Sequence, residues 1–234
     1  MNMRRTKCGI LNRNQIKYIA IIAMVIDHIA YAFIHDTNLA YLIMRFFGRI
    51  TGPTMAYFLA EGYYYTRDIK RYVLRLGIFT LISWIPFSIF EYGMIIPRLG
   101  VIYTLLLGLI AIWIWDRGRC SSELKVSCLS GLCLLSYFGD WSVYNVSWCF
   151  TFYIFRDNIK LKWTAYCCIC AVYCLRAFNH SPNTSIASVG VFTAPALIGL
   201  AYSGKSGSRK KIHKWFFYVF YPLHMIIISV MQSV

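Results

Sequence analysis

Charged side chains are scarce in this 234-residue sequence, and acidic side chains are the scarcest. Only 14% of the residues are charged, with 9 Asp and Glu against 24 Lys and Arg, while 59% are hydrophobic. Too few polar residues remain to cover the surface of a water-soluble globule of this length, which excludes the soluble protein classes. The solvent around most of the surface must therefore be lipid.

The sequence also lacks internal repeats, low-complexity tracts and heptad patterns. A transporter built from inverted repeats would show two matching halves, so their absence weighs against that class. The first apolar segment lacks the small-residue site at which signal peptides are cleaved, and it contains Asp27 and His28. We therefore expect this segment to be retained as the first membrane span.

Most of the nine cysteines fall inside apolar segments, which speaks against a disulfide framework. Cys167, Cys170 and Cys174 would share one face of a helix, and thiolates at such a spacing can bind a metal. No histidine or carboxylate lies close enough in the sequence to complete a ligand set. We expect these cysteines to be small buried hydrophobic residues and predict no metal.

Apolar stretches long enough to cross a bilayer recur along the whole chain, separated by short basic or turn-rich loops. The pattern predicts an all-α transmembrane helical bundle of about nine spans in a single domain over residues 1–234. The approximate bounds of the predicted spans are 15–35, 41–64, 72–90, 98–115, 124–138, 141–155, 161–178, 185–203 and 213–232.

Basic residues indicate the orientation of this bundle. A net charge of +15 raises the possibility of nucleic-acid binding, but the basic residues lie in the loops between apolar stretches, as they do in cytoplasmic loops. With the N-terminus inside, all but Arg45, Arg49, Arg98 and Arg176 fall on inner loops. We therefore predict a multi-pass protein of the inner (cytoplasmic) membrane with its C-terminus outside, in contact with the lipid bilayer and not with nucleic acid.

Ionisable side chains within the apolar stretches are candidates for the functional site, because each costs several kcal/mol in the hydrocarbon core unless it is paired or hydrated. They are Asp27, His28, Arg45, Arg49, Glu61 and His224. Any one of them could instead form an ion pair that only holds helices together. His224 follows Tyr221 and Pro222, and the proline is expected to kink the last helix.

Lys17 and His28 are eleven residues apart, a spacing that returns to within about 20° of the same helix face and rises about 16 Å. A cation near the lipid phosphates and an imidazole near the membrane centre would suit a long donor with an anionic and a reactive end, such as acyl-coenzyme A. Histidine is well suited to general-base catalysis near neutral pH. Lys17 could equally be an ordinary anchor at the inner end of a helix.

Asp27 lies about 100° around the helix from His28, so it is free to pair with Arg45 or Arg49 instead of orienting the imidazole. The two arginines are four residues apart, on one helix face. They could also bind an anionic substrate or stabilise an oxyanion. The loop cations Arg67, Lys70, Arg71 and Arg75 are expected mainly to set the topology. Arg71 and Arg75, at the entry to the third span, are the preferred exceptions as ligands for donor phosphates.

These residues lie in sequence blocks that resemble the TraX family, named for a conjugative-pilin acetylase. The resemblance is carried, in order, by KYIAIIAMVIDHIA, by FFGRITGPTMAYFLAEGYYYTRDIKRYVLRLGIFTLISWIPF, by YTLLLGLIAI, by DWSVYNV and by KWFFYVFYPLHMII. The Lys17-x10-His28 element also resembles the Arg/Lys-x10-His element of acyltransferase type 3 membrane proteins.

The resemblance implies an acetyl-coenzyme A-dependent N- or O-acetyltransferase acting on a pilin-like N-terminus, an envelope glycan or a small molecule. His28 would be the general base with Asp27 beside it, and Arg45, Arg49, Glu61, Tyr221 and His224 would shape the substrate cavity. Lys17, Arg71 and Arg75 would meet the donor. The main alternative is a transporter or flippase that uses the same polar residues to bind and release its substrate.

Overall fold

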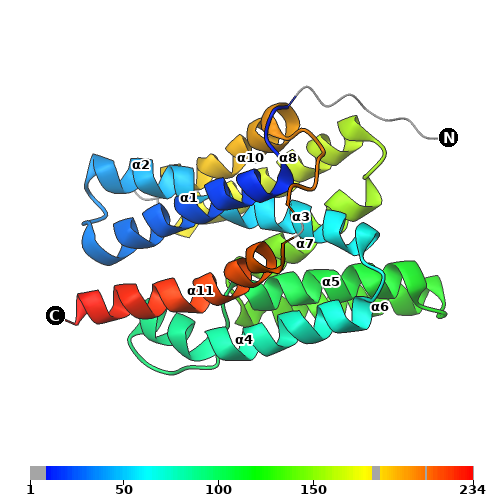
Figure 1. Cartoon of the computed structure of the whole chain (residues 1–234), viewed down its shortest axis with the longest axis horizontal. Helices are drawn as coiled ribbons and strands as arrows, with labels where there is room; N and C mark the ends of the chain where they lie inside the picture. The colour runs from blue at the N-terminus through cyan, green and yellow to red at the C-terminus, as the bar shows by residue number, and fades with distance from the viewer. Residues whose placement is uncertain (1–8, 181–184, 209, 234) are drawn as a thin grey trace. The chain divides into compact units, whose positions relative to one another are not determined.

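The computed structural model describes residues 9–180, 185–208 and 210–233, and every regular element in these ranges is helical (Figure 1). The all-α class predicted from the sequence is therefore confirmed. In chain order the elements are α1 (Arg13–Phe33), α2 (Leu39–Gly48), α3 (Thr51–Tyr65), α4 (Ile69–Tyr92), α5 (Val101–Arg117), α6 (Ser122–Leu135), η1 (Ser136–Phe138), α7 (Ser142–Ile154), α8 (Ile159–His180), η2 (Ile186–Thr193), α10 (Ala194–Ala196), η3 (Leu197–Ala201) and α11 (Lys211–Gln232).

Four helices are long and apolar enough to cross a membrane. They are Arg13–Phe33, Ile69–Tyr92, Ile159–His180 and the Trp215–Gln232 part of α11. Length and hydropathy thus support four spans within the described residues, and they support a membrane protein.

The predicted span 41–64 is not one helix. The structure ends α2 at Gly48 and begins α3 at Thr51, with a turn at residues 49–50. Pro53 explains the new start, because proline has no backbone N–H and fits the first turn of a helix better than its interior. The expectation of a single continuous span was therefore wrong at this point.

The predicted span 185–203 is also irregular, since it divides into the 3-10 helix η2, the short α10 and the π-helix η3. Small residues in η2 allow a close approach to α2. Gly190 lies so near the Phe46 carbonyl that an added Cβ would overlap it. The irregular backbone is therefore packed against protein, where its polar groups can be satisfied.

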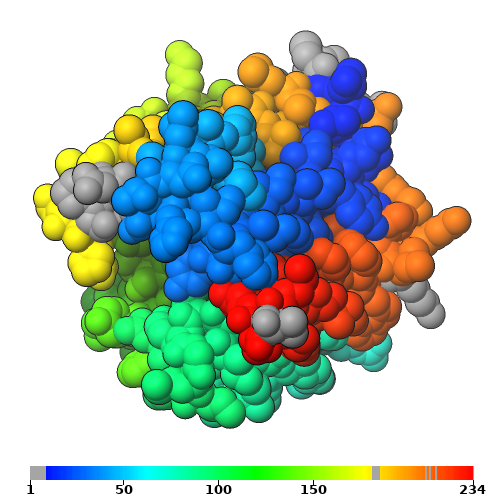
Figure 2. Space-filling model, turned by 90° about the vertical axis from the view of Figure 1, so that its left-hand side faces the viewer, coloured from blue at the N-terminus to red at the C-terminus, as the bar shows by residue number. Residues whose placement is uncertain are grey.

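The chain divides into two compact units, the first formed by the described parts of 1–54 and 172–217, the second by 55–171 and the described part of 218–234. In the first unit α1 packs on α2, and α2 packs on η2. Figure 2 shows α1 and α2 (both blue) side by side at the surface. The boundary falls inside α3, α8 and α11. The single domain expected over residues 1–234 remains a prediction.

The second unit is built around α5, which contacts α4, α6 and α7. Its buried core includes Leu107, Ala111 and Val146, and the fully buried Trp148 packs near Tyr166 with their ring centroids 5.9 Å apart. This core fixes the relative positions of α5 and α7, whose ends carry polar side chains described below.

The first helix begins at a capping box. The Asn12 side chain accepts a hydrogen bond from the Gln15 backbone N–H, and the Gln15 side chain accepts one from the Asn12 N–H. These reciprocal bonds satisfy two backbone donors that a helix start leaves without partners. The box thus fixes the first turn of the helix that carries Lys17 and His28.

Gly190→Ala should lower the free energy of unfolding by about 1–3 kcal/mol, because a methyl group there must displace the Phe46 backbone. Gly199→Ala is the matched control in the same segment, since nothing lies within 4 Å of a Cβ added there. Thermal unfolding of the purified proteins in detergent compares the two. Equal unfolding temperatures would contradict the close packing of η2 on α2.

Candidate functional site

Lys17 and His28 lie in one uninterrupted helix, α1, as their spacing required. Both side chains are half-buried. The Lys17 Nζ lies 5.2 Å from the centroid of the Phe217 ring, a cation–π distance. The helical geometry assumed for the Lys17-x10-His28 element is therefore confirmed, while the roles assigned to the two residues remain predictions.

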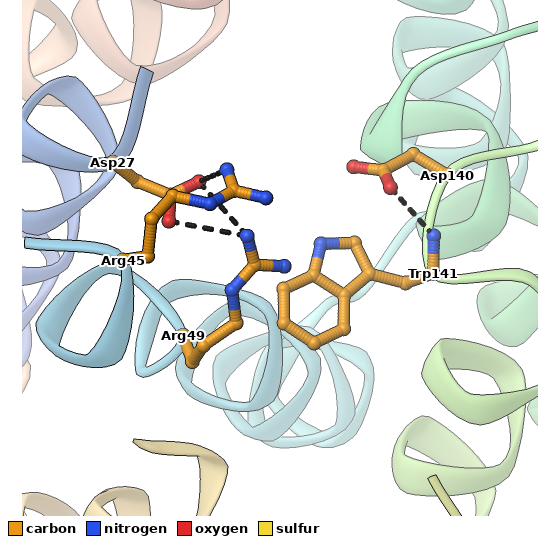
Figure 3. Close-up of polar contacts among 5 residues, drawn as sticks. All are labelled: Asp27, Arg45, Arg49, Asp140 and Trp141. Atoms are coloured by element: carbon orange, nitrogen blue, oxygen red, sulfur yellow. Dashed lines mark hydrogen bonds and ion pairs between the residues drawn. The ribbon is translucent and has the colours of Figure 1, made fainter. Parts of the chain in front are cut away.

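Asp27, next to His28 in the chain, is the centre of a buried ion cluster (Figure 3). Arg45 Nη1 donates to Asp27 Oδ2 at 2.8 Å, and Arg49 Nη2 donates to Oδ1 at 3.2 Å and to Oδ2 at 3.4 Å. The Asp27 residue is only 8% exposed. The expectation that Asp27 pairs with Arg45 or Arg49 is confirmed, and it pairs with both.

The cluster fixes how α2 ends against α1. Arg45 lies in the last turn of α2, and Arg49 is its C-terminal cap, with a backbone N–H that bonds the Arg45 carbonyl. A Cβ at Gly48 would overlap the Asp27 side chain, so a glycine is needed for the carboxylate to reach both guanidinium groups. The close approach of the two helices and the ion cluster therefore depend on each other.

Arg45 also lies over aromatic rings. Its guanidinium carbon is 5.3 Å from the Tyr31 centroid and 5.7 Å from the Tyr41 centroid. Cation–π contacts of this kind hold the planar group in place and reduce the cost of removing it from water. The arginine is thus oriented by one carboxylate and two rings, all within the first unit.

Three predicted cavity residues, Glu61, Tyr221 and His224, belong to the second unit. Glu61 is half-buried in α3. The Tyr221 hydroxyl accepts a hydrogen bond from the Val101 backbone N–H at 3.2 Å, which caps the start of α5 where Gly100 has no side chain to do so. Tyr221 therefore has a clear packing function, and its place in a substrate cavity remains a prediction.

His224 is buried in α11, two residues after Pro222. Its Nδ1 lies 2.9 Å from the Phe220 carbonyl oxygen, and because a carbonyl can only accept, Nδ1 carries the proton. The imidazole stacks on the Phe220 ring with centroids 5.3 Å apart. These contacts fix the ring orientation and the tautomer of His224.

The two predicted donor-binding arginines on α4 differ in their surroundings. Arg71 is exposed and pairs with Asp68, the N-terminal cap of the same helix, at 2.9 Å. Arg75 Nε donates to the Tyr218 hydroxyl at 3.2 Å, and its guanidinium lies over the rings of Tyr72 and Tyr218. Arg75 is therefore held by aromatic contacts in the second unit, whereas Arg71 projects from its surface.

A second polar cluster, which the sequence did not suggest, joins the C-terminal ends of α3, α5 and α7. The hydroxyls of Tyr63 and Tyr153 each donate to Asp116 at 2.6 Å, one to each carboxylate oxygen. The hydrogen bond from Tyr153 and, to a smaller extent, the one from Tyr63 lower the pKa of the Asp116 carboxyl below its ordinary value. In the sequence, this cluster is indicated only by Tyr63 and Tyr153, which lie near the ends of two predicted spans.

These residues belong to an open pocket of about 580 Å³. It is lined by Tyr63, Tyr64, Trp115, Asp116, Arg117, Tyr153, Ile154, Arg156 and Asp157. All nine lie in the second unit, whereas the Asp27 cluster belongs to the first.

The DWSVYNV block also contains an unusual backbone. Trp141 and Ser142 have φ angles of 59° and 42°, in the left-handed region that L-residues seldom adopt. The Trp141 backbone N–H donates to the Asp140 carboxylate at 2.8 Å (Figure 3). The Asp140 backbone carbonyl accepts from the Thr104 hydroxyl at 2.9 Å. These bonds hold a conformation that costs on the order of 1–3 kcal/mol per residue.

Replacing the central carboxylate should destabilise the first unit. Asp27→Asn leaves two guanidinium groups facing a neutral amide, and breaking a buried ion pair in this way costs about 3–5 kcal/mol. Asp36→Asn, in the exposed turn between α1 and α2, is the control and should leave stability unchanged within about 0.5 kcal/mol. Chemical or thermal unfolding measures both, and two equally mild effects would argue against a stabilising cluster.

The matches to known proteins cover nearly the whole chain. The family model described as "TraX protein" matches residues 12–232. The chain is 32% identical over 229 residues to the "Probable fimbrial assembly protein FimC, serogroup H1" of Dichelobacter nodosus, covering 92% of this chain and 93% of that protein. No solved structure gives a significant match. A family match over nearly the full length, together with this relative, shows that the chain belongs to the TraX family.

Proposed function

We propose that this protein is a membrane-embedded acyltransferase that moves an acetyl group from cytoplasmic acetyl-coenzyme A to an amine or hydroxyl acceptor. The observation that carries the proposal is the placement of His28 in the apolar helix α1, directly after the carboxylate that binds Arg45 and Arg49. A cluster so costly to bury in an apolar environment is typical of a functional site.

In the proposed reaction, the nitrogen or oxygen of the acceptor attacks the thioester carbonyl, and His28 takes the proton that this atom loses. The new C–N or C–O bond forms, the C–S bond breaks, and the proton passes to the departing thiolate. Arg45 or Arg49 would stabilise the negative charge that develops on the carbonyl oxygen. Because Asp27 is already bonded to both arginines, its role would be to position them rather than to accept a proton itself.

The donor arrives from the cytoplasm if the basic loops are inside. We propose the nine-span arrangement in the inner membrane, with the N-terminus cytoplasmic and the C-terminus outside. The loops that follow α3, α5 and α7 then lie on the cytoplasmic side. Lys17, at the cytoplasmic end of α1, and Arg71 and Arg75 would meet the donor's phosphates there.

A pilin-like N-terminus is the acceptor that the comparisons favour. The chain belongs to the TraX family, whose resemblance implies pilin acetylation, and the relative from Dichelobacter nodosus is named as a probable fimbrial assembly protein. An N-terminal peptide amine has a pKa near 7.7–8, so a fraction of it is already neutral and nucleophilic near neutral pH. An envelope glycan hydroxyl would need the same base.

His28→Ala should lower the rate of acetyl transfer by about 100-fold or more, as expected when a general base is removed. The measurement is the transfer of labelled acetyl from acetyl-coenzyme A to acceptors in membranes that contain the variant. His35→Ala is the matched control, because His35 is exposed just beyond the end of α1, and it should keep full activity. Full activity in His28→Ala, with the protein folded, would rule out the proposed base.

A reporter fused after residue 234 tests the arrangement in the membrane. An enzyme that is active only outside the cytoplasm should be active there, and one that is active only in the cytoplasm should be inactive. The opposite pattern would mean an even number of spans and would overturn the nine-span proposal, while leaving the transfer reaction open to its own test.

A further inference from the structure

The pocket in the second unit is formed where three helices end. Tyr63 and Tyr64 belong to the last turn of α3, Trp115 to that of α5, and Tyr153 to that of α7. Its volume, about 580 Å³, is in the range of small-molecule and cofactor sites. It is polar and open, which distinguishes it from a packing defect between apolar helices.

Hydrogen bonds join three helix ends in the wall of the pocket. The Asp116 carboxylate accepts one hydroxyl on each oxygen, at 2.6 Å from Tyr63 and from Tyr153, and Arg117 Nε lies 3.5 Å from it. The rings of Tyr63 and Tyr153 meet edge to face with centroids 5.6 Å apart. These contacts join the ends of α3, α5 and α7 and position the Asp116 carboxylate in the lining.

Arginine and aromatic side chains lie next to each other in this lining. The Arg156 guanidinium lies 3.2 Å from the centroid of the Tyr64 ring, so its flat face is covered by the ring. A guanidinium stacked in this way directs its N–H groups sideways, in the plane that suits phosphate oxygens. Arg117, with a side chain 57% exposed, adds a second cation to the same pocket.

The charges of the lining select among ligands. The lining contains two arginines, Arg117 and Arg156, and two carboxylates, Asp116 and Asp157, so it offers partners to anionic groups and to hydrogen-bond donors of one ligand. A ligand that combines phosphate with a flat ring and an amino group fits this lining: phosphate pairs with the arginines, the ring stacks on aromatic side chains, and the amino group donates to a carboxylate. An adenine nucleotide has all three features.

We propose that this pocket binds the adenine nucleotide end of the acyl donor. The inference rests on the proposed acetyltransferase function, because coenzyme A is the donor in that reaction and ends in adenosine 3′,5′-bisphosphate. In the nine-span arrangement the pocket opens to the cytoplasm, where the donor is found. Arg156 is then a substrate-binding residue that the sequence did not suggest, additional to Lys17, Arg71 and Arg75.

The test measures binding of adenosine 3′,5′-bisphosphate to the purified full chain by calorimetry. The chain carries His28→Ala, so that binding is measured separately from acetyl transfer. Arg156→Ala should weaken binding about tenfold or more, a change of about 1.4 kcal/mol or more. Arg156→Lys should restore part of it. Arg98→Ala is the matched control, because Arg98 also lies over a tyrosine ring, Tyr137 at 5.0 Å, but outside this pocket, and it should bind normally.

Competition identifies what the pocket recognises. Adenosine and inorganic phosphate should each displace the nucleotide only at much higher concentration, and vesicles of phosphatidylglycerol should not displace it. Displacement by the vesicles would mean a lipid headgroup site and would overturn the proposal, as would unchanged binding in Arg156→Ala. The unfolding temperature of each variant shows whether it is folded.

The two proposals fail separately. In a chain with His28 intact, Arg156→Ala should raise the KM for acetyl-coenzyme A about tenfold and leave kcat within about twofold. Acetyl transfer with an unchanged KM would refute the nucleotide pocket and leave the acyltransferase standing. Tight nucleotide binding in a protein that transfers no acetyl group would support the pocket and refute the proposed reaction.

Discussion

The carboxylate of Asp27 shared between Arg45 and Arg49 is the interaction on which the first unit depends. Removing three charged groups from water costs several kcal/mol for each, and the cost is offset only when geometry and hydrogen bonds are good. The approach of α2 at Gly48, the capping of α2 by Arg49 and the rings beside Arg45 all serve that geometry. The position of α2 against α1 therefore follows from the burial of one carboxylate.

The break between α2 and α3 belongs to the same arrangement. It places Arg49 at a turn, where its side chain reaches Asp27, and it is held to α1 by the Thr51 hydroxyl, which donates to the Ala20 carbonyl at 2.8 Å. Non-helical backbone is tolerated in a membrane protein where protein covers it, and here α1 does so. Had 41–64 been one straight helix, Pro53 would have removed a hydrogen bond from its interior.

In the second unit, polar side chains meet at the C-terminal ends of three helices. Tyrosine hydroxyls from α3 and α7 converge on a single carboxylate of α5, so a charged group is satisfied where three helices leave the apolar region. Tyrosine suits this position because its ring is apolar and its hydroxyl is polar. The same residues line an open pocket together with Arg117 and Arg156.

The sequence by itself determined the solvent, the helical class and the polar residues worth attention. Composition and apolar length require no long-range information, and a pairing of Asp27 with Arg45 or Arg49 was expected from the cost of unpaired charge in lipid. That the carboxylate binds both arginines was decided by the tertiary structure. Only the tertiary structure decided where 41–64 breaks, that 185–203 is irregular, and that Tyr63, Asp116 and Tyr153 meet. Those features depend on contacts between residues far apart in the chain, such as Tyr63 with Asp116, 53 positions away, and Gly190 with Phe46. Hydrophobic periodicity reports one helix at a time and does not contain them.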